Sequence, residues 1–98
     1  MRFIFKDKKI QKLYTHKKGK HKYPPEVIKA FFTVMAVIRR VQDERELYAL
    51  RSLHYKALKG KRSHEHSIRL NKQWRLVVER AKDERGRYLW IINIEDYH

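Results

Sequence analysis

The residues best suited to acid–base chemistry stand together at the end of the sequence, in Glu95-Asp96-Tyr97-His98. They follow residues 89–94, an apolar run rich in isoleucine that is typical of a core strand. An imidazole titrates near neutral pH, and a phenol ring can orient a phosphate or stack on a nucleobase. Because a strand is a rigid support, the pattern predicts an acid–base site at its tip.

Positive charge that would serve such a site is concentrated in two segments. The chain of 98 residues carries 25 Lys and Arg against 11 Asp and Glu, a formal net charge of +14. Residues 2–22 and residues 51–75 hold most of the excess, with a single acidic residue in each. This excess indicates a polyanionic partner, and nucleic acid fits better than a membrane, because the apolar helix of the chain is not basic on its apolar side. A solvated helix face explains the first segment equally well.

The elements that must position these residues follow from capping signals and periodicity. Residues 2–5 favour a short strand, and Asp7 is a suitable N-cap for a helix that ends before Gly19. A second helix is expected to begin near Pro25, because its apolar residues recur at spacings of three and four. Residues 43–46 resemble the capping box of a third, short helix. The apolar stripe of the second helix consists of Val27, Phe31, Val34, Ile38 and Val41.

The second half of the chain changes to the two-residue period of β-strands. Residues 66–70 and 74–79 alternate between apolar and polar side chains, and a last strand is expected over residues 87–95. Residues 71–73 and 82–86 have the composition of turns. We therefore expect an α+β fold, in which two or three N-terminal helices pack on one face of a small twisted antiparallel sheet.

Hairpin connectivity brings the end of the chain to the second basic segment. In an antiparallel meander the tip of the last strand lies beside the start of the preceding strand, near Trp74. Tyr97 and His98 are then expected near Arg75 and near the loop that follows Leu53. Cations around a histidine suit phosphodiester cleavage, because the transition state carries additional negative charge.

Several classes of site and location are excluded or disfavoured. The chain has no cysteine, so a disulfide or a thiolate metal site is impossible. His64 and His66 share one face of a strand but lack a third ligand at a recognisable spacing, so no metal is expected. Residues 1–5 are too short for a signal peptide, and the longest apolar stretch, residues 34–38, is too short to cross a bilayer. A cytoplasmic protein is therefore expected.

Four fragments, in this order, resemble the HigB toxins, which are killer proteins of toxin–antitoxin modules within the RelE/ParE superfamily. The resemblance implies a RelE-like, microbial-RNase-type fold in a single toxin domain over residues 1–98. It also implies a ribosome-dependent endoribonuclease that cuts translated mRNA at the ribosomal A site and contacts ribosomal RNA there. A HigA-type helix-turn-helix antitoxin is the implied protein partner, with no metal or organic cofactor and a role in plasmid maintenance. The fragments are Leu58-Lys59-Gly60, His66-Ser67-Ile68-Arg69-Leu70-Asn71, Gln73-Trp74-Arg75-Leu76 and Glu95-Asp96-Tyr97-His98.

The same resemblance maps the family's active site onto Lys59, Asp96, Tyr97 and His98. Many members also carry a loop histidine three residues before that lysine; here Lys56 occupies this position, and His54 stands two residues earlier. We take His98 as the candidate acid or base, His54 as its candidate partner and Lys56 as an alternative phosphate contact. The residues expected to bind RNA are Lys56, Lys61, Arg62, Arg69 and Arg75.

Two other functions remain open from the sequence. A ParE-like toxin would inhibit DNA gyrase by binding, without RNA chemistry, on the same fold. A non-catalytic basic module would bind nucleic acid with a steep dependence on salt and would tolerate loss of His98. At the level of single residues, Tyr97 could instead cap the core, and Trp74 and Trp90 are expected to be core residues rather than stacking platforms.

Overall fold

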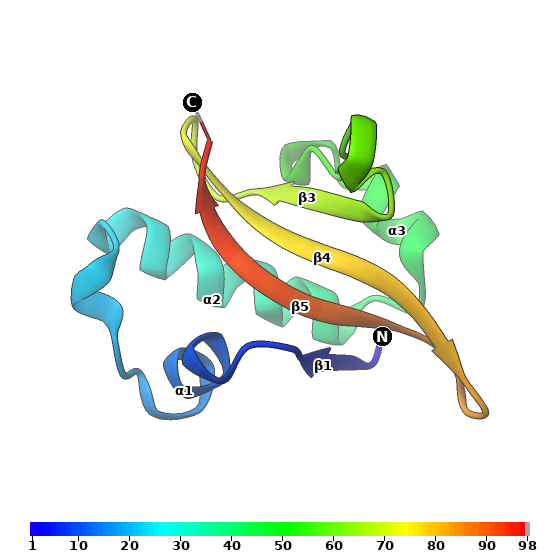
Figure 1. The fold of residues 1–98 in the computed structure, drawn as a ribbon, viewed down its shortest axis with the longest axis horizontal. Coiled ribbons are helices and arrows are strands. Elements are labelled where there is room, and N and C mark those ends of the chain that lie inside the picture. The colour runs from blue at the N-terminus through cyan, green and yellow to red at the C-terminus, as the bar shows by residue number, and fades with distance from the viewer. Residues whose placement is uncertain (98) are drawn as a thin grey trace.

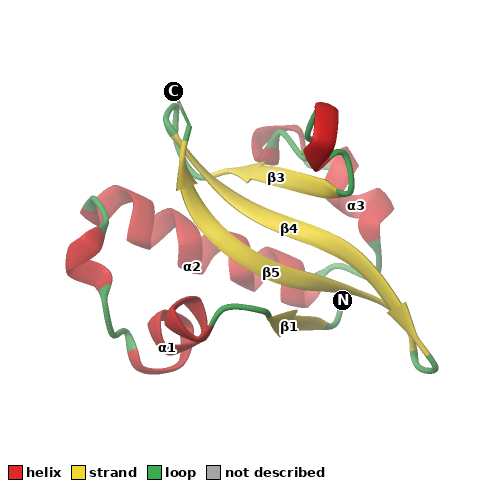
Figure 2. Cartoon of the chain, viewed as in Figure 1, coloured by secondary structure: helices red, strands yellow, loops and turns green. Residues whose placement is uncertain are grey.

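The computed structural model describes residues 1–97 and shows helices gathered on one side of a twisted sheet (Figure 1). Within these residues the sheet has five strands in the order β1-β5-β4-β3-β2. The helices α1 (Lys8–His16), α2 (Pro25–Arg40) and α3 (Glu44–Ala49) lie on one face. The opposite face, here called the open face, carries no α-helix from the described part of the chain, only the short 3₁₀ turn Gly60–Arg62 (Figure 2). The strands are β1 (Phe3–Phe5), β2 (Lys56–Ala57), β3 (Glu65–Arg69), β4 (Trp74–Asp83) and β5 (Gly86–Asp96).

The three helices begin where the sequence predicts them, and side chains cap the starts of two of them, α1 and α3. Asp7 caps α1, because its Oδ1 accepts a hydrogen bond from the backbone N–H of Lys9 at 2.6 Å. Helix α2 begins at Pro25, whose missing N–H costs nothing in a first turn. Asp43 caps α3 by accepting from the N–H of Arg45 at 2.9 Å. Helix α3 ends at Ala49, one residue short of Leu50, which is 39% exposed.

The three antiparallel strands predicted for the second half are confirmed as β3, β4 and β5. The register pairs Arg69 with Arg75 across β3 and β4, and Trp74 with Asp96 across β4 and β5. Strand β1 lies parallel to the other edge of β5, so the complete sheet is mixed. The nearly continuous apolar sequence of β5 follows from this interior position between two strands.

The core lies between α2 and the helix-covered face of the sheet. The predicted apolar stripe of α2 is confirmed, since each of its five residues is at most 4% exposed. On the sheet side, Leu76, Leu89 and Ile91 are completely buried against this stripe. Trp74 packs against the same cluster, whereas Trp90 lies on the open face, where it is paired with Glu79. No helix within residues 1–97 has the length and apolar content needed to cross a membrane.

Candidate active site

Two arginines stand directly opposite each other on the open face of the sheet. Arg69 on β3 and Arg75 on β4 form a cross-strand pair, as the sequence predicted for adjacent strands. Like charges in this position repel, so the pair costs stability unless an anion lies against it. Nε and Nη1 of Arg75 are buried and have no hydrogen-bond acceptor within residues 1–97.

The tip of β5 brings Tyr97 to these arginines, as hairpin geometry predicted. The backbone N–H of Tyr97 donates to the carbonyl oxygen of Gln73 at 2.6 Å, which extends the pairing beyond the strand. The guanidinium carbon of Arg75 lies 5.6 Å from the centroid of the Tyr97 ring, in cation–π contact. Tyr97 is 45% exposed, so it does not cap the core. His98 lies outside the described residues.

Asp96 is held at the same tip by the side chain of Gln73, which lies in the turn between β3 and β4. Nε2 of Gln73 donates to Oδ1 of Asp96 at 2.8 Å. Asn71 orders the turn itself, because its Oδ1 accepts from the backbone N–H groups of Gln73 and Trp74 at 2.8 and 2.7 Å. The turn thus fixes the geometry of the strand end that carries the predicted terminal residues.

The loop after Leu53 supplies two lysines to a hollow beside Tyr97. The hollow has a volume of about 300 Å³, and both predicted loop lysines, Lys56 and Lys59, line it. Lys61 is exposed and lies outside the lining. The complete lining consists of Lys56, Ala57, Leu58, Lys59, Arg62 and Tyr97.

His54 lies at one end of this arrangement rather than in the hollow. It adopts a left-handed backbone conformation, with φ of 48°, at the end of a short 3₁₀ turn. Nη1 of Arg69 lies 3.2 Å from Nε2 of His54, and because a guanidinium can only donate, the imidazole nitrogen accepts. Arg69 also donates through Nε to the carbonyl oxygen of Asn71 at 3.3 Å. A row of four side chains therefore crosses the open face, in the order His54, Arg69, Arg75 and Tyr97.

Arg62 closes the loop over the sheet. It donates two hydrogen bonds to Glu95 on β5, at 2.9 and 2.7 Å, and one to Glu65 on β3, at 2.6 Å. These carboxylates lie on the strands that flank β4, so the guanidinium spans β4 on the open face. The bonds to Glu95 and then to Glu65 raise the pKa of Arg62. Its charge is thus already matched by two carboxylates.

A buried polar cluster supports the same loop from the helix-covered side. The ring of Tyr55 stacks on His66 of β3 with centroids 4.8 Å apart, and its hydroxyl donates to Glu44 of α3 at 2.7 Å. Nε2 of His66 lies 3.1 Å from the hydroxyl of Tyr48. Burial first, and then the charge of Arg80, lower the pKa of His66, against the opposing effect of Glu44. The cluster thus joins α3 and β3 to Tyr55, the residue directly before β2, where the loop starts.

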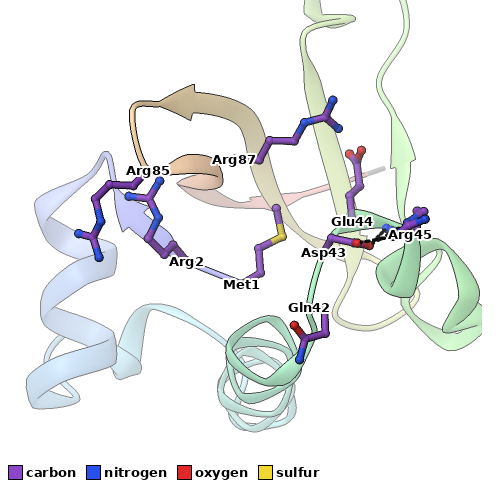
Figure 3. A pocket seen from close by; sticks show the side chains of 8 residues that line it. All are labelled: Met1, Arg2, Gln42, Asp43, Glu44, Arg45, Arg85 and Arg87. Carbon is purple, nitrogen blue, oxygen red and sulfur yellow. Dashed lines mark hydrogen bonds and ion pairs between the residues drawn. The ribbon is translucent and has the colours of Figure 1, made fainter.

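A larger hollow lies elsewhere in the described part of the chain and is lined by different side chains. It measures about 620 Å³ and mixes acids with arginines (Figure 3). Two of its arginines are already neutralised, Arg2 by Asp83 at 2.5 Å and Arg45 by Asp43 at 2.9 Å. None of the residues predicted for catalysis or RNA binding lines it. We therefore place the candidate active site at the smaller hollow beside Tyr97.

No metal centre is indicated in the described part of the chain. His64 is exposed, whereas His66 is buried within the aromatic cluster, so the two do not present a joint pair of ligands. Residues 1–97 contain no group of three or more His, Asp or Glu side chains that could hold a metal ion.

A family model of the RelE-like toxin of the type II toxin–antitoxin system HigB matches residues 3–94. The chain belongs to this HigB-like toxin family. The protein is therefore a toxin of a type II toxin–antitoxin system and has an antitoxin partner. A search of curated protein sequences finds no match to this toxin.

Solved structures confirm the RelE-type α+β fold of this toxin. A structure described as the YoeB/ParE toxin from Agrobacterium tumefaciens has a TM-score of 0.60 and 12% identity, with 100% of each chain covered. The toxin is also similar to a chain of the YoeB-YefM complex from Staphylococcus aureus, with a TM-score of 0.52 and 16% identity, covering 100% of this chain and 97% of that one. At these identities the likeness concerns the fold alone.

The residues that hold the site together were not predicted for that role. Glu65 and Glu95 fix Arg62, and Tyr55 and Glu44 anchor the loop. Only Glu95 had been named from the sequence, for acid–base chemistry and not as a partner of Arg62. One signal was present, because Glu65 is the single acidic residue of the basic segment 51–75. A lone carboxylate in a cationic segment indicates an ion pair. No comparable signal distinguishes Tyr55 from an ordinary core tyrosine.

Proposed function

We propose that this single-domain toxin is a ribosome-dependent endoribonuclease that cuts translated mRNA in the cytoplasm. The observation that carries the proposal is the hollow in which Lys56 and Lys59 meet the exposed ring of Tyr97, with Arg75 behind that ring. Lysine amines can hold a phosphodiester, and an exposed aromatic ring can stack on a neighbouring base. Such a site takes single-stranded RNA, whose bases are free to stack.

The reaction needs no metal in this proposal. The 2′-hydroxyl of the RNA attacks the adjacent phosphorus, a base takes the hydroxyl proton, and an acid protonates the 5′-oxygen as its bond to phosphorus breaks. His98 and His54 are the candidates for the proton transfers. Lys59 and Arg75 stabilise the negative charge that develops on the phosphate oxygens.

The remaining predicted residues take supporting roles. Arg75 acts through its positive charge beside the Tyr97 ring, because its Nε and Nη1 are buried. Asp96 orients the strand tip through Gln73, and Lys56 and Lys61 offer further phosphate contacts. Arg69 orients His54, and Arg62 holds the loop at the hollow through its carboxylate partners. The RNA-binding role of Arg62 stays a prediction.

The partners in this proposal are mRNA and ribosomal RNA at the A site, together with a HigA-type helix-turn-helix antitoxin. Family membership supports the antitoxin in general, and the gene adjacent to the toxin gene identifies its type. Membership in a HigB-type system also supports a role in plasmid maintenance. A small helix-turn-helix protein encoded there would be expected to bind and silence the toxin.

The test is cleavage of mRNA on purified translating ribosomes. We expect Lys59→Ala, and separately deletion of His98, to reduce the cleavage rate at saturating toxin by about 100-fold, because each removes stabilisation or proton transfer from the transition state. Lys82→Ala removes an exposed lysine at the far end of β4 and serves as the control of equal charge. Unchanged cleavage by both site variants would refute the proposed mechanism.

A ParE-like function is the second candidate, favoured by the fold shared with a toxin described as YoeB/ParE. It predicts inhibition of DNA supercoiling by purified gyrase without any RNA cleavage. The ribosome assay and the supercoiling assay on the same preparation distinguish the two functions.

A further inference from the structure

A lysine-rich surface covers α1 and its connection to α2, away from the residues assigned to cleavage. The only acidic side chain in residues 1–22 is Asp7, and its Oδ1 caps α1. All the lysines of this surface are exposed. We call it the lysine surface; it consists of Lys8, Lys9, Lys12, Lys17, Lys18, Lys20 and Lys22.

The charge of the lysine surface is not neutralised by the protein. Within residues 1–97, none of its seven amines forms an ion pair, although Lys6, Arg62 and Arg80 do so elsewhere. Mutual repulsion of amines on one short helix and turn opposes folding. An anionic partner bound there would remove that repulsion.

The lysine surface is hollowed rather than flat. Lysines from α1, including Lys9 and Lys12, line one part of a hollow of about 250 Å³, and Lys18 and Lys22 from the connection line another. The chain can reverse this sharply because Gly19 has φ of +85°, a left-handed conformation that other residues rarely adopt. The amines therefore converge on one volume from two elements, as contacts to neighbouring phosphates require.

One aromatic contact joins the lysine surface to the start of β4, directly before Arg75 of the candidate active site. Tyr23, which lines the hollow, meets Trp74 edge-on with ring centroids 5.6 Å apart. Trp74 is paired with Asp96 and precedes Arg75. One polyanion can thus contact the lysine surface while an adjoining segment of it reaches the active site.

Amines outnumber aromatic rings on the lysine surface. The exposed rings beside its seven lysines are the imidazoles of His16 and His21, whereas Tyr23 is half-buried and packs against Trp74. Amines contact phosphates rather than bases, which favours the regular backbone of a duplex. Tyr97 at the active site offers the opposite, a ring suited to a single strand.

We propose that the lysine surface binds the phosphate backbone of double-stranded RNA next to the single-stranded segment that enters the active site. The proposal rests on the proposed function only in taking RNA as the polyanion; it does not depend on cleavage. An acidic protein segment is the competing occupant, and the experiment below distinguishes it from RNA.

The experiment compares two variants of equal net charge. The first, K9Q/K12Q/K18Q/K22Q, neutralises the four lysines that line the hollow. The second, R39Q/R40Q/K82Q/R87Q, removes four exposed cations near the end of α2 and the β4–β5 hairpin that have no ion pair within residues 1–97. Fluorescence anisotropy with an RNA hairpin bearing a single-stranded tail, and with the tail alone, gives each dissociation constant at several salt concentrations. Urea unfolding confirms that both variants are folded.

We expect the first variant to bind the hairpin RNA about tenfold or more weakly and to lower the slope of log affinity against log salt by roughly 3, because up to four phosphate contacts are lost. The second variant should retain its affinity for the hairpin RNA within about threefold. The two variants should have similar affinities for the single-stranded tail alone. If both variants lose the same affinity for the hairpin RNA, net charge alone explains the binding and the proposal is overturned. Unchanged hairpin binding with lost binding of an acidic peptide would overturn it in favour of a protein partner.

This outcome is separable from that of the proposed function. Hairpin binding that depends on the lysine surface, in a toxin that cleaves no RNA, would leave the inference standing and refute the cleavage proposal. If the toxin cleaves mRNA on ribosomes but hairpin binding does not depend on the four lysines, the cleavage proposal stands and the inference about the lysine surface is refuted.

Discussion

Tyr97 combines three features that rarely occur together in one surface aromatic residue. Its backbone is held by Gln73, its ring lies over the guanidinium of Arg75, and nearly half of its surface is exposed. A ring that is fixed but accessible can stack on a base without a large loss of side-chain entropy. The hydroxyl group has no part in that interaction, which separates stacking from proton transfer.

Tyr97→Phe keeps the ring and its contact with Arg75, so it should change the affinity for a single-stranded RNA tail by less than about twofold. Tyr97→Leu removes the ring and should weaken binding by the roughly 1–3 kcal/mol that base–aromatic stacking contributes. Anisotropy titrations with the tail measure both. A large loss in Tyr97→Phe would assign the role to the hydroxyl group instead of the ring.

At the scale of elements, the short strand β2 attaches the loop after Leu53, which carries Lys56 and Lys59, to the sheet. It forms only two residue pairs with β3, Lys56 with Ser67 and Ala57 with His66. So short a strand is marginal by itself. The cluster in which Tyr55 meets His66 and Glu44 adds a second attachment, from α3, at the point where the loop begins.

His66 makes that attachment sensitive to pH. Its pKa lies below the ordinary value of 6.5, mainly because of burial, so the unfolded chain binds a proton more readily than the folded one. The free energy of unfolding should therefore fall as pH drops below about 6.5 and level off below the folded-state pKa. Urea unfolding at pH 7.5 and pH 5.5 measures this loss. The groups that face His66 are Tyr48 and Glu44 of α3, Tyr55 and Arg80 of β4.

His66→Gln is the matched variant for this measurement. It removes the titrating ring, so the difference in unfolding free energy between the two pH values should shrink relative to the parent protein, even if the variant is less stable at both. The same pH dependence in parent and variant would show that other groups cause it.

At the scale of the whole molecule, the helices supply the core and the open face is left for function. Helix α2 presents its stripe to one face of the sheet, and Phe31 lies at the centre of that contact with no exposed surface. Arg69, Arg75, Tyr97 and the loop after Leu53 belong to the other face or to its edge. Substitutions in the two layers should therefore have separate effects on stability and on activity.

Phe31→Ala should lower the free energy of unfolding by about 3–5 kcal/mol, because it removes a buried ring and leaves a cavity. Phe32→Ala, at the neighbouring and only half-buried position, should cost clearly less. Urea unfolding of both variants measures the difference. Equal losses would mean that the contact between α2 and the sheet is not the main core.

Capping residues and the periodicity of apolar residues made the helices and the longer strands predictable. Asp7, Pro25 and Asp43 mark the starts of three helices, and the two-residue period locates β3 and β4, because capping and burial act between residues close in sequence. The proximity of Tyr97 to Arg75 was also predictable, since a hairpin fixes which residues of its two strands are neighbours. Strand β2 was not predicted, because two residues carry no period.

By itself the sequence determined the helices, the antiparallel meander and the gathering of basic residues near the end of β5, where the candidate site lies. Only the tertiary structure decided which cations are available there. Arg62 is matched by Glu65 and Glu95, whereas Lys56 and Lys59 line the hollow beside Tyr97. The physical reason is that an ion pair depends on distances between strands that are far apart in the chain, and composition does not contain those distances.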